Sequence, residues 1–364
     1  MRILQVLSSL GAGGAERFAV DLSNELSKNN DVYILTWINS GNANFYREQI
    51  CNRVHQIKLD AKDTLLSKIV LVFTILKVIF KIKPNAVHAH CKGFPFIIIP
   101  SLVYRKPRYF YTVHNIAKYD TKPGISTWIR RIFLNINIHA VTISKICSES
   151  FLEYYGYKDY TTIENGCREL HTTKALVEVK KEIDTYRFTK NTKIFVNVAR
   201  ITKEKNQLML VDVFNKLIEE GKDVVLLIFG YTKAYPELTK KIIERIHYPK
   251  RIKVMGTRNN IPDYLHEVDF FCLPSLWEGL PISLLEAGMS GVYPIATPVG
   301  GIPDVIKDES WGLLSHDTSM MAFKEQITKA LNIKVNRKEL SLLYDRFYSM
   351  ENCAKRYIEI YNGN

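Results

Sequence analysis

Short apolar runs alternate with segments of helical periodicity along most of the 364-residue chain. The runs are rich in β-branched side chains, which is typical of buried parallel strands. In the first half they cover residues 3–7, 32–36, 86–90, 109–113 and 139–143, and in the second half 194–199, 224–229, 252–255, 270–273 and 292–296. Amphipathic segments such as 15–28, 65–83 and 207–220 lie between them. The alternation predicts an α/β fold with parallel sheets.

The alternation is interrupted once, by a polar and less periodic stretch from about residue 167 to 192. We therefore expect two doubly wound, Rossmann-like domains, over residues 1–170 and 192–345, joined by a hinge over 171–191. The last segment, 346–364, has a helical pattern, and we expect it to pack back toward the N-terminal domain. Two facing domains of this kind form an interdomain cleft between the carboxyl ends of their sheets, where open α/β folds bind ligands.

Composition removes several classes of protein. A chain with 46% hydrophobic and 24% charged residues can fill real cores, so disorder is not expected. The six cysteines include no CxxC pair, and they indicate free thiols in a reducing compartment. The start of the chain predicts a strand that ends in a glycine loop, not a signal peptide. The most apolar window, 65–80, is too short and too charged to span a bilayer.

The net charge of +13 indicates an anionic partner. Most of the excess, +9, lies in residues 1–170, where basic side chains mix with aliphatic and aromatic ones over 65–83, 104–108 and 128–133. This mixture suits docking on an anionic membrane, although 65–80 can also be a core helix with solvated charges. We expect a cytoplasmic protein bound peripherally to the inner face of the cell membrane. A basic nucleic-acid-binding protein is the alternative from another class, but no nucleic-acid motif is present.

Three loops carry candidate chemistry. The first, Gly11-Ala12-Gly13-Gly14-Ala15-Glu16, follows a strand and opens a helix, so it can bind an anion. It breaks the GxGxxG pattern because Glu16 replaces the third glycine, and this disfavours a nicotinamide-dependent dehydrogenase. The second loop places Arg200 and Lys205 after a strand, where a guanidinium fork and an ammonium suit a diphosphate. The alternative for this loop is an ordinary solvated basic segment.

The third loop holds two carboxylates, Glu278 ahead of a helix and Glu286 inside it. A retaining glycosidase needs its two carboxylates about 5 to 5.5 Å apart. Eight residues on a helix separate them by roughly 12 Å, so a hydrolase is disfavoured. Taken alone, the pair can also be two unrelated surface acids.

Taken together, these segments closely resemble retaining glycosyltransferases of family 4, which have the GT-B fold. The resemblance follows the chain in order, through Gly13-Gly14-Ala15-Glu16-Arg17, Val87-His88-Ala89-His90, Thr112-Val113-His114, Asn165-Gly166, Arg200 with Lys205, Glu278 with Glu286, and Pro298-Val299-Gly300-Gly301-Ile302-Pro303. It implies a fold of two facing Rossmann-like domains, with the acceptor bound by the N-terminal domain and a nucleotide sugar bound by the C-terminal one.

The resemblance also implies roles for single residues. Arg200 and Lys205 match the basic pair on the donor diphosphate, and they would stabilise the charge of the leaving group. Glu278 matches an acid near the hydroxyls of the donor sugar, and Glu286 one that binds the ribose.

Backbone N–H groups of Gly279 and Leu280 would contact the sugar and phosphate, and Gly13 and Gly14 would let the first loop approach the substrates. His114 matches a histidine beside the reacting sugar.

The resemblance implies transfer of a hexose or N-acetylhexosamine to a saccharide or lipid-linked saccharide in surface polysaccharide synthesis. Retention looks like front-face displacement, so we name no enzymic nucleophile, and we expect no metal and no other cofactor. The pair His88 and His90 can be read as a metal site, but no matched carboxylate is evident. Ala199 stands where the family often has glycine, and the loop after Glu278 lacks a second glycine, which puts the shape of the sugar pocket in doubt. A related sugar-nucleotide epimerase is the enzymatic alternative.

Overall fold

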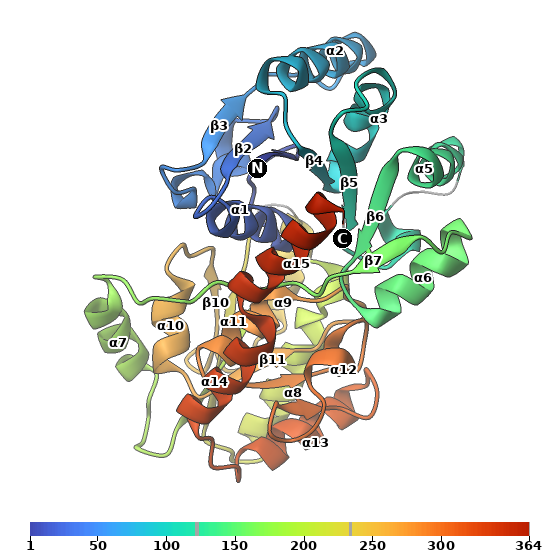
Figure 1. The fold of residues 1–364 in the computed structure, drawn as a ribbon. Coiled ribbons are helices and arrows are strands. Elements are labelled where there is room, and N and C mark those ends of the chain that lie inside the picture. Colours follow the sequence, from blue (N-terminus) through green and yellow to red (C-terminus); the bar gives the residue numbers. More distant parts are fainter. Residues whose placement is uncertain (121–123, 233–234, 364) are drawn as a thin grey trace. The chain divides into compact units, whose positions relative to one another are not determined.

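The computed structural model describes residues 1–120, 124–232 and 235–363, and it divides the chain into two compact units (Figure 1). The first unit consists of residues 1–166 and 350–364, and the second of residues 167–349. Each contains one parallel sheet with interleaved helices, which confirms the α/β class that the alternation of patterns predicts.

The sheet of the first unit has seven strands in the order β3-β2-β1-β4-β5-β6-β7, and the paired strands are parallel. Its strands are β1 (Arg2–Val6), β2 (Asp31–Thr36), β3 (His55–Lys58), β4 (Ala86–His90), β5 (Arg108–Val113), β6 (Ile138–Thr142) and β7 (Tyr160–Thr162). Its helices are α1 (Gly14–Leu26), α2 (Leu65–Ile82), α3 (Phe94–Val103), α4 (Ala117–Asp120), α5 (Ile125–Ile136), α6 (Lys145–Tyr155) and α15 (Met350–Asn362).

The sheet of the second unit has six strands in the order β10-β9-β8-β11-β12-β13. Its strands are β8 (Lys193–Val198), β9 (Val224–Phe229), β10 (Ile252–Gly256), β11 (Phe270–Leu273), β12 (Tyr293–Ala296) and β13 (Leu313–Leu314). Its helices are α7 (Leu176–Thr185), α8 (Gln207–Glu219), α9 (Pro236–Glu244), α10 (Ile261–Glu267), α11 (Ile282–Met289), α12 (Ile302–Val305), α13 (Met320–Ala330) and α14 (Arg337–Tyr348).

In both sheets the strand order reverses once, between β1 and β4 and between β8 and β11. Open α/β sheets bind ligands outside the carboxyl ends of the strands that flank such a reversal. The four strands at these reversals are buried along nearly their whole length, as expected of strands covered by helices on both faces, whereas the edge strand β3 is mostly exposed. The topology therefore marks the loops after these four strands as candidate sites.

The segment 171–191, expected to be a hinge, contains α7 and belongs to the second unit, which begins at Cys167 and not at residue 192. Val179 and Ile183 form the buried stripe of α7, and the hydroxyl of Tyr264 in α10 donates to Glu182 at 2.7 Å. So narrow an apolar stripe leaves most of the segment polar, which is why the sequence pattern suggested a linker. At the other end, Ser349 separates α14 from α15, and α15 belongs to the first unit.

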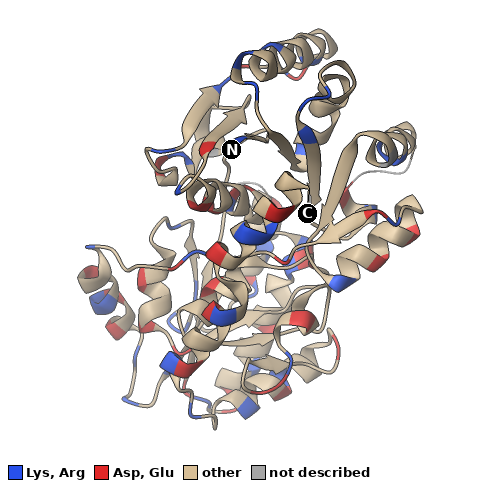
Figure 2. Cartoon of the chain, in the orientation of Figure 1, with Lys and Arg blue, Asp and Glu red and all other residues tan. Residues whose placement is uncertain are grey.

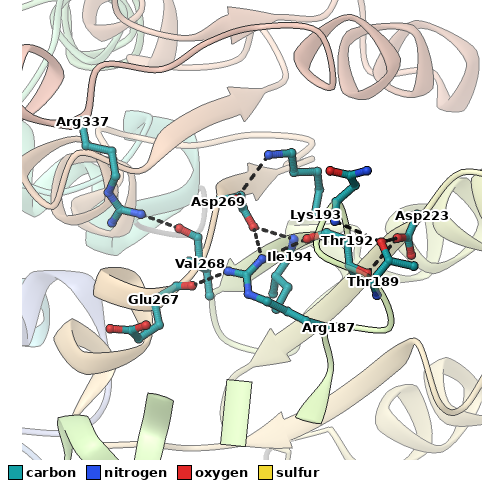
Figure 3. A network of polar contacts seen from close by, with 11 residues as sticks. Arg187, Thr189, Thr192, Lys193, Ile194, Asp223, Glu267, Val268, Asp269 and Arg337 are labelled. Carbon is teal, nitrogen blue, oxygen red and sulfur yellow. Dashed lines mark hydrogen bonds and ion pairs between the residues drawn. The ribbon is translucent and has the colours of Figure 1, made fainter. Parts of the chain in front are cut away.

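A polar network fixes the amino ends of the strands in the second unit (Figure 3). The carboxylate of Asp269, just before β11, accepts hydrogen bonds from Arg187 at 3.1 Å and from the backbone N–H of Ile194 in β8 at 2.9 Å. Asp223, just before β9, accepts from the hydroxyls of Thr189 and Thr192 at 2.6 and 2.8 Å. The network lies at the edge opposite the strands' carboxyl ends, so it holds the sheet without occupying the candidate site.

The first unit exposes many large apolar side chains on α2 and α5. Leu71, Ile75, Ile79 and Ile82 form the buried stripe of α2. The helix also exposes Leu65, Leu66, Ile69, Val70, Phe73 and Phe80, together with Lys68, Lys77 and Lys81. The basic positions of α2 appear as blue segments of that helix in Figure 2. Helix α5 exposes Ile125, Trp128 and Ile136. Within the described part of the chain, none of the helices combines the length and the apolar character that crossing a bilayer requires.

One basic residue in the segment 128–133 does not face outward, contrary to the sequence interpretation of this segment as a docking surface. Arg130 is 6% exposed, its guanidinium donates to the Asp120 carboxylate at 2.7 Å, and it lies over the rings of Phe94 and Tyr111. The pair with Asp120 and the aromatic rings account for its burial, because a buried charge needs a partner. Its neighbour Arg131 is exposed.

Candidate functional site

The loop after β8 places Arg200 and Lys205 at the carboxyl end of that strand. Gln207 fixes the backbone of this loop, because its buried side-chain amide donates to the carbonyl of Arg200 at 2.9 Å. The Arg200 side chain is exposed, and among the described residues its guanidinium has no hydrogen-bond partner. Lys205 is mostly buried, with 16% of its side chain exposed. The loop thus offers one open cation and one that is fixed in place.

Glu278, in the loop after β11, meets Lys205 across the strand reversal. The Nζ atom of Lys205 lies 2.5 Å from Oε1 of Glu278, and the hydroxyl of Ser275 donates to the same oxygen at 2.7 Å. The carboxylate is buried, with 8% of its side chain exposed. Both contacts use Oε1, and among the described residues none forms a hydrogen bond with Oε2. That oxygen can therefore accept a hydrogen bond from a ligand hydroxyl.

The segment Thr297–Gly301 holds the Glu278 loop from the other side. The hydroxyl of Thr297 donates to the carbonyl of Ser275 at 2.6 Å, and the N–H of Gly301 donates to the carbonyl of Gly279 at the same distance. Gly300 has a φ of +58°, and a Cβ atom there would lie 2.0 Å from the carbonyl oxygen of Glu278. Only glycine fits this close approach. The glycine pair Gly300-Gly301 thus shapes the loop that carries Glu278.

Gly279, Leu280 and Glu286 follow along the same loop and helix. Gly279 and Leu280 are buried between Glu278 and the start of α11. Glu286 lies within α11 and is half-buried, so the expectation that Glu278 precedes the helix and Glu286 lies inside it is confirmed. The N–H of Leu276 donates to the carbonyl of Glu204 at 2.8 Å, which joins this loop to the one after β8. Arg200, Lys205 and Glu278 therefore lie on two loops that contact each other in the second unit, and Glu286 lies in the helix that follows the second loop.

In the first unit, the glycine loop and His114 follow β1 and β5. Gly13 caps the amino end of α1, Gly14 is its first residue, and a Cβ atom at Gly13 would lie 2.2 Å from an oxygen of the Glu16 carboxylate. His114 is half-buried, with its ring 5.6 Å from that of Phe18 in α1. Burial lowers the pKa of His114 to about 3, so its imidazole is neutral near pH 7.

His114 ends a chain of buried polar side chains, and the sequence motifs include its histidines but not Gln5 or Tyr361. Its Nε2 lies 2.9 Å from Nδ1 of His90, and Nε2 of His90 lies 2.8 Å from Oε1 of Gln5 in β1. Beyond Gln5 the chain reaches Tyr361 of α15 and then His88. No local signal marks Gln5 or Tyr361, since each sits in an ordinary apolar or helical pattern.

The possible metal site at His88 and His90 has another physical explanation. Every ring nitrogen of the two histidines has a hydrogen-bond partner in the protein. Across residues 1–120, 124–232 and 235–363, no cluster of three or more His, Cys, Asp or Glu side chains could hold a metal ion. The polar chain accounts for the two buried histidines.

Two family models match the chain. One, described as Glycosyltransferase Family 4, matches residues 12–168, and the other, described as Glycosyl transferases group 1, matches residues 178–342. The first match includes β2 to β7 and the second includes β8 to β13, together with the site loops described above.

Relatives and solved structures agree with these matches. The UDP-Gal:alpha-D-GlcNAc-diphosphoundecaprenol alpha-1,3-galactosyltransferase of Escherichia coli is 24% identical over 302 residues, 80% of this chain and 75% of the relative. The capsular polysaccharide biosynthesis glycosyltransferase CapH of Staphylococcus aureus is 23% identical over 349 residues, 92% of this chain and 93% of the relative. The crystal structure of Anabaena HepE in complex with UDP-glucose matches with a TM-score of 0.82 at 16% identity, covering 100% of both chains.

Proposed function

Because this chain belongs to glycosyltransferase family 4 and has the GT-B fold, we propose that it transfers a hexose or N-acetylhexosamine with retention of configuration. The donor is a nucleotide sugar, bound by the second unit. The acceptor is a saccharide or a lipid-linked saccharide in surface polysaccharide synthesis, bound by the first unit. The named substrate of the Escherichia coli relative and the capsular role in the name of CapH support this choice of acceptor.

The observation that carries the proposal is the contact of Lys205 with Glu278 at the strand reversal of the second unit. We assign Arg200 and Lys205 to the diphosphate, Glu278 to the sugar hydroxyls and Glu286 to the ribose. A cation held in a partly dry site stabilises the charge of a leaving diphosphate far better than one in water, and losing such a contact costs about 3 kcal/mol of barrier.

In the proposed reaction the acceptor oxygen bonds to the anomeric carbon on the face from which the phosphate oxygen departs. The acceptor proton passes to the leaving phosphate, so no side chain serves as nucleophile. The Arg200 and Lys205 cations balance the charge on the diphosphate, and the proposal includes no metal and no other cofactor. In the second unit we assign the backbone N–H groups of Gly279 and Leu280 to the sugar and phosphate. In the first unit we assign His114 to the reacting sugar, and Gly13 and Gly14 to the close approach of the first loop to the substrates.

The test begins with a thermal-shift screen against UDP-, GDP- and ADP-sugars, since a ligand at 100 times its Kd stabilises by about 2.7 kcal/mol. Transfer from the best donor is then measured for Glu278→Ala and Lys205→Ala, with Lys203→Ala, an exposed lysine of the same loop, as the control. We expect both site variants to fold and to lose transfer. Near-normal turnover in both rejects the mechanism, and NMR of the product's anomeric proton decides retention against inversion.

We also propose that the exposed faces of α2 and α5 dock on an anionic membrane. Apolar side chains there stand beside the exposed lysines of α2 and beside Arg131 of α5, a combination that inserts into the interface while the cations meet lipid phosphates. This arrangement would bring the first unit to a lipid-linked acceptor at the inner face of the cell membrane.

Liposome sedimentation tests the docking surface. Phe73→Ser with Trp128→Ser should reduce binding to vesicles containing phosphatidylglycerol at least tenfold. Met321→Ser, which changes an exposed side chain of the second unit, should bind like the wild type. Equal binding by all three proteins rejects this surface.

A further inference from the structure

The chain of polar side chains in the first unit is assembled from β1, β4, β5 and α15. Its members are His114, His90, Gln5, Tyr361, His88, Thr112 and Tyr357. Apart from His114 they are all buried, so each hydrogen bond replaces one that water would supply to the unfolded chain. An interior chain of this length is stable only when the donors and acceptors alternate along it.

The amide of Gln5 fixes the direction of the first half of the chain. Its Oε1 can only accept a hydrogen bond, so the contact at 2.8 Å requires a proton on Nε2 of His90. A neutral imidazole has one donor and one acceptor, which makes Nδ1 of His90 an acceptor. Because Nε2 of His114 lies 2.9 Å from that Nδ1, it must be the donor.

The second half of the chain runs in the same direction. Nε2 of Gln5 donates to the hydroxyl oxygen of Tyr361 at 3.4 Å, and that hydroxyl donates to Nδ1 of His88 at 2.5 Å. Nε2 of His88 then donates to the hydroxyl of Thr112 at 2.7 Å. Burial holds the pKa of His88 and of His90 well below the ordinary value, so neither ring carries the extra proton that would break the alternation.

We propose that Gln5 and His90 are positioning residues that hold the His114 imidazole in the tautomer protonated at Nε2. Tyr361 supports this role by fixing the orientation of the Gln5 amide. Nδ1 of His114 is then an acceptor. The consequence for the ligand rests on the proposed function. With Nδ1 unprotonated, His114 accepts a hydrogen bond from a hydroxyl of the bound sugar and cannot donate one from this nitrogen to a sugar oxygen.

The opposite direction defines the competing state. With the Gln5 amide turned over, its NH₂ group would donate to Nε2 of His90, and His90 would donate from Nδ1 to His114. His114 would then be protonated at Nδ1. The two states differ in which nitrogen of one ring carries the proton, and this difference can be observed directly.

The deciding experiment is long-range ¹H–¹⁵N NMR of the full chain labelled with ¹⁵N-histidine, without ligand, with His114→Gln used to identify the signals of His114. We expect the protonated ring nitrogen to be Nε2. A His114 ring protonated at Nδ1, or an equal mixture of tautomers, overturns the proposal. The answer is read from the wild-type spectrum, and the His114→Gln spectrum serves only to show which signals belong to His114.

Variants then test the positioning roles. In Gln5→Leu and in Tyr361→Phe the amide no longer fixes the direction, so the His114 signals should move toward the average of the two tautomers. Tyr109→Phe is the matched control, because it removes a buried hydroxyl that donates to the carbonyls of Pro100 and Tyr104. These residues do not belong to the hydrogen-bonded series that ends at His114. Unchanged His114 signals in both test variants would reject the positioning role.

Calorimetric titration with UDP separates this inference from the proposed function. The residues assigned to the donor diphosphate and ribose belong to the second unit, so Gln5→Leu should bind UDP with the wild-type Kd. A wild-type protein with the expected tautomer but without sugar transfer would count against the proposed function and leave the tautomer assignment standing. A wild-type protein that transfers sugar but has His114 protonated at Nδ1 would overturn the tautomer assignment and leave the proposed function standing.

Discussion

The Nζ atom of Lys205 lies 2.5 Å from Oε1 of Glu278, joining side chains 73 positions apart in the sequence. Both side chains are largely buried, so each charge depends on the other while no ligand is bound. A diphosphate that binds Lys205 would therefore have to share this cation with the carboxylate.

The pair predicts strong coupling in a double-mutant cycle of Lys205→Met and Glu278→Gln. Each single variant leaves one charge poorly compensated, whereas the double variant removes both charges. The free energy of unfolding lost in the double variant should therefore be smaller than the sum of the two single losses by about 1 to 3 kcal/mol. Urea unfolding monitored by circular dichroism measures the free energy of unfolding of the wild type and of the three variants. Additivity within about 0.5 kcal/mol would show that the contact contributes nothing to stability.

Gly300→Ala should impair the site more than the fold. The added methyl group meets the carbonyl of Glu278, so the loop must move and donor turnover should fall by at least tenfold. Gly221→Ala is the matched control, since Gly221 also has a positive φ, of +77°, but nothing within 4 Å of the new methyl group. Gly221→Ala should lose about 1 to 2 kcal/mol of stability from backbone strain. Gly300→Ala should lose more than this, because the loop that carries Glu278 must also shift. Equal activity in the two variants would contradict the role of Gly300.

The buried histidines predict a loss of stability in mild acid. Burial depresses the pKa of His88, His90 and His114, so below about pH 6.5 the unfolded chain binds protons that the folded chain excludes. The free energy of unfolding should therefore be fully present above pH 7 and decrease as the pH falls, by up to about 1.4 kcal/mol per pH unit for each histidine.

Urea unfolding between pH 5.5 and 7.5 checks this slope. His90→Gln should reduce the slope of the free energy of unfolding against pH by the contribution of one histidine. His171→Gln, which alters an exposed ring, should leave the slope unchanged. A wild-type free energy that stays constant over the range would contradict the prediction.

Arg130→Gln should destabilise the first unit by about 3 to 5 kcal/mol, because it leaves the Asp120 carboxylate buried without its cation. Arg131→Gln changes an adjacent exposed arginine and should cost less than about 1 kcal/mol. Thermal unfolding of the two variants measures the difference. Similar melting temperatures would show that the Asp120 pair does not stabilise the unit.

The sequence predicted the two sheets and the order of the site loops because both follow from local patterns. Strands of parallel sheets are apolar along their length, and Arg200, Lys205 and Glu278 directly follow such strands. Partners that come from distant segments could not be predicted in this way. Neither the ion pair of Arg130 with Asp120 nor the segment α7, with its two buried side chains, gives a pattern that stands out from a solvated run.

The two histidines of β4 show the same limit within the first unit. Residues two apart in a strand lie on the same face, and both histidines do reach the same polar chain. What they bind depends on Gln5, 85 positions from His90, and on Tyr361, 273 positions from His88. Only the folded topology brings these groups together.

Because α15 belongs to the first unit but follows the second in the chain, the order of synthesis differs from the order of assembly. The second unit is one continuous segment and can fold as soon as it has left the ribosome. The first unit is made first but must wait for α15, whose tyrosines complete the bonding of His88 and Thr112. The earliest-made half of this enzyme is therefore the last to mature, and a truncated nascent chain carries an unfinished interior.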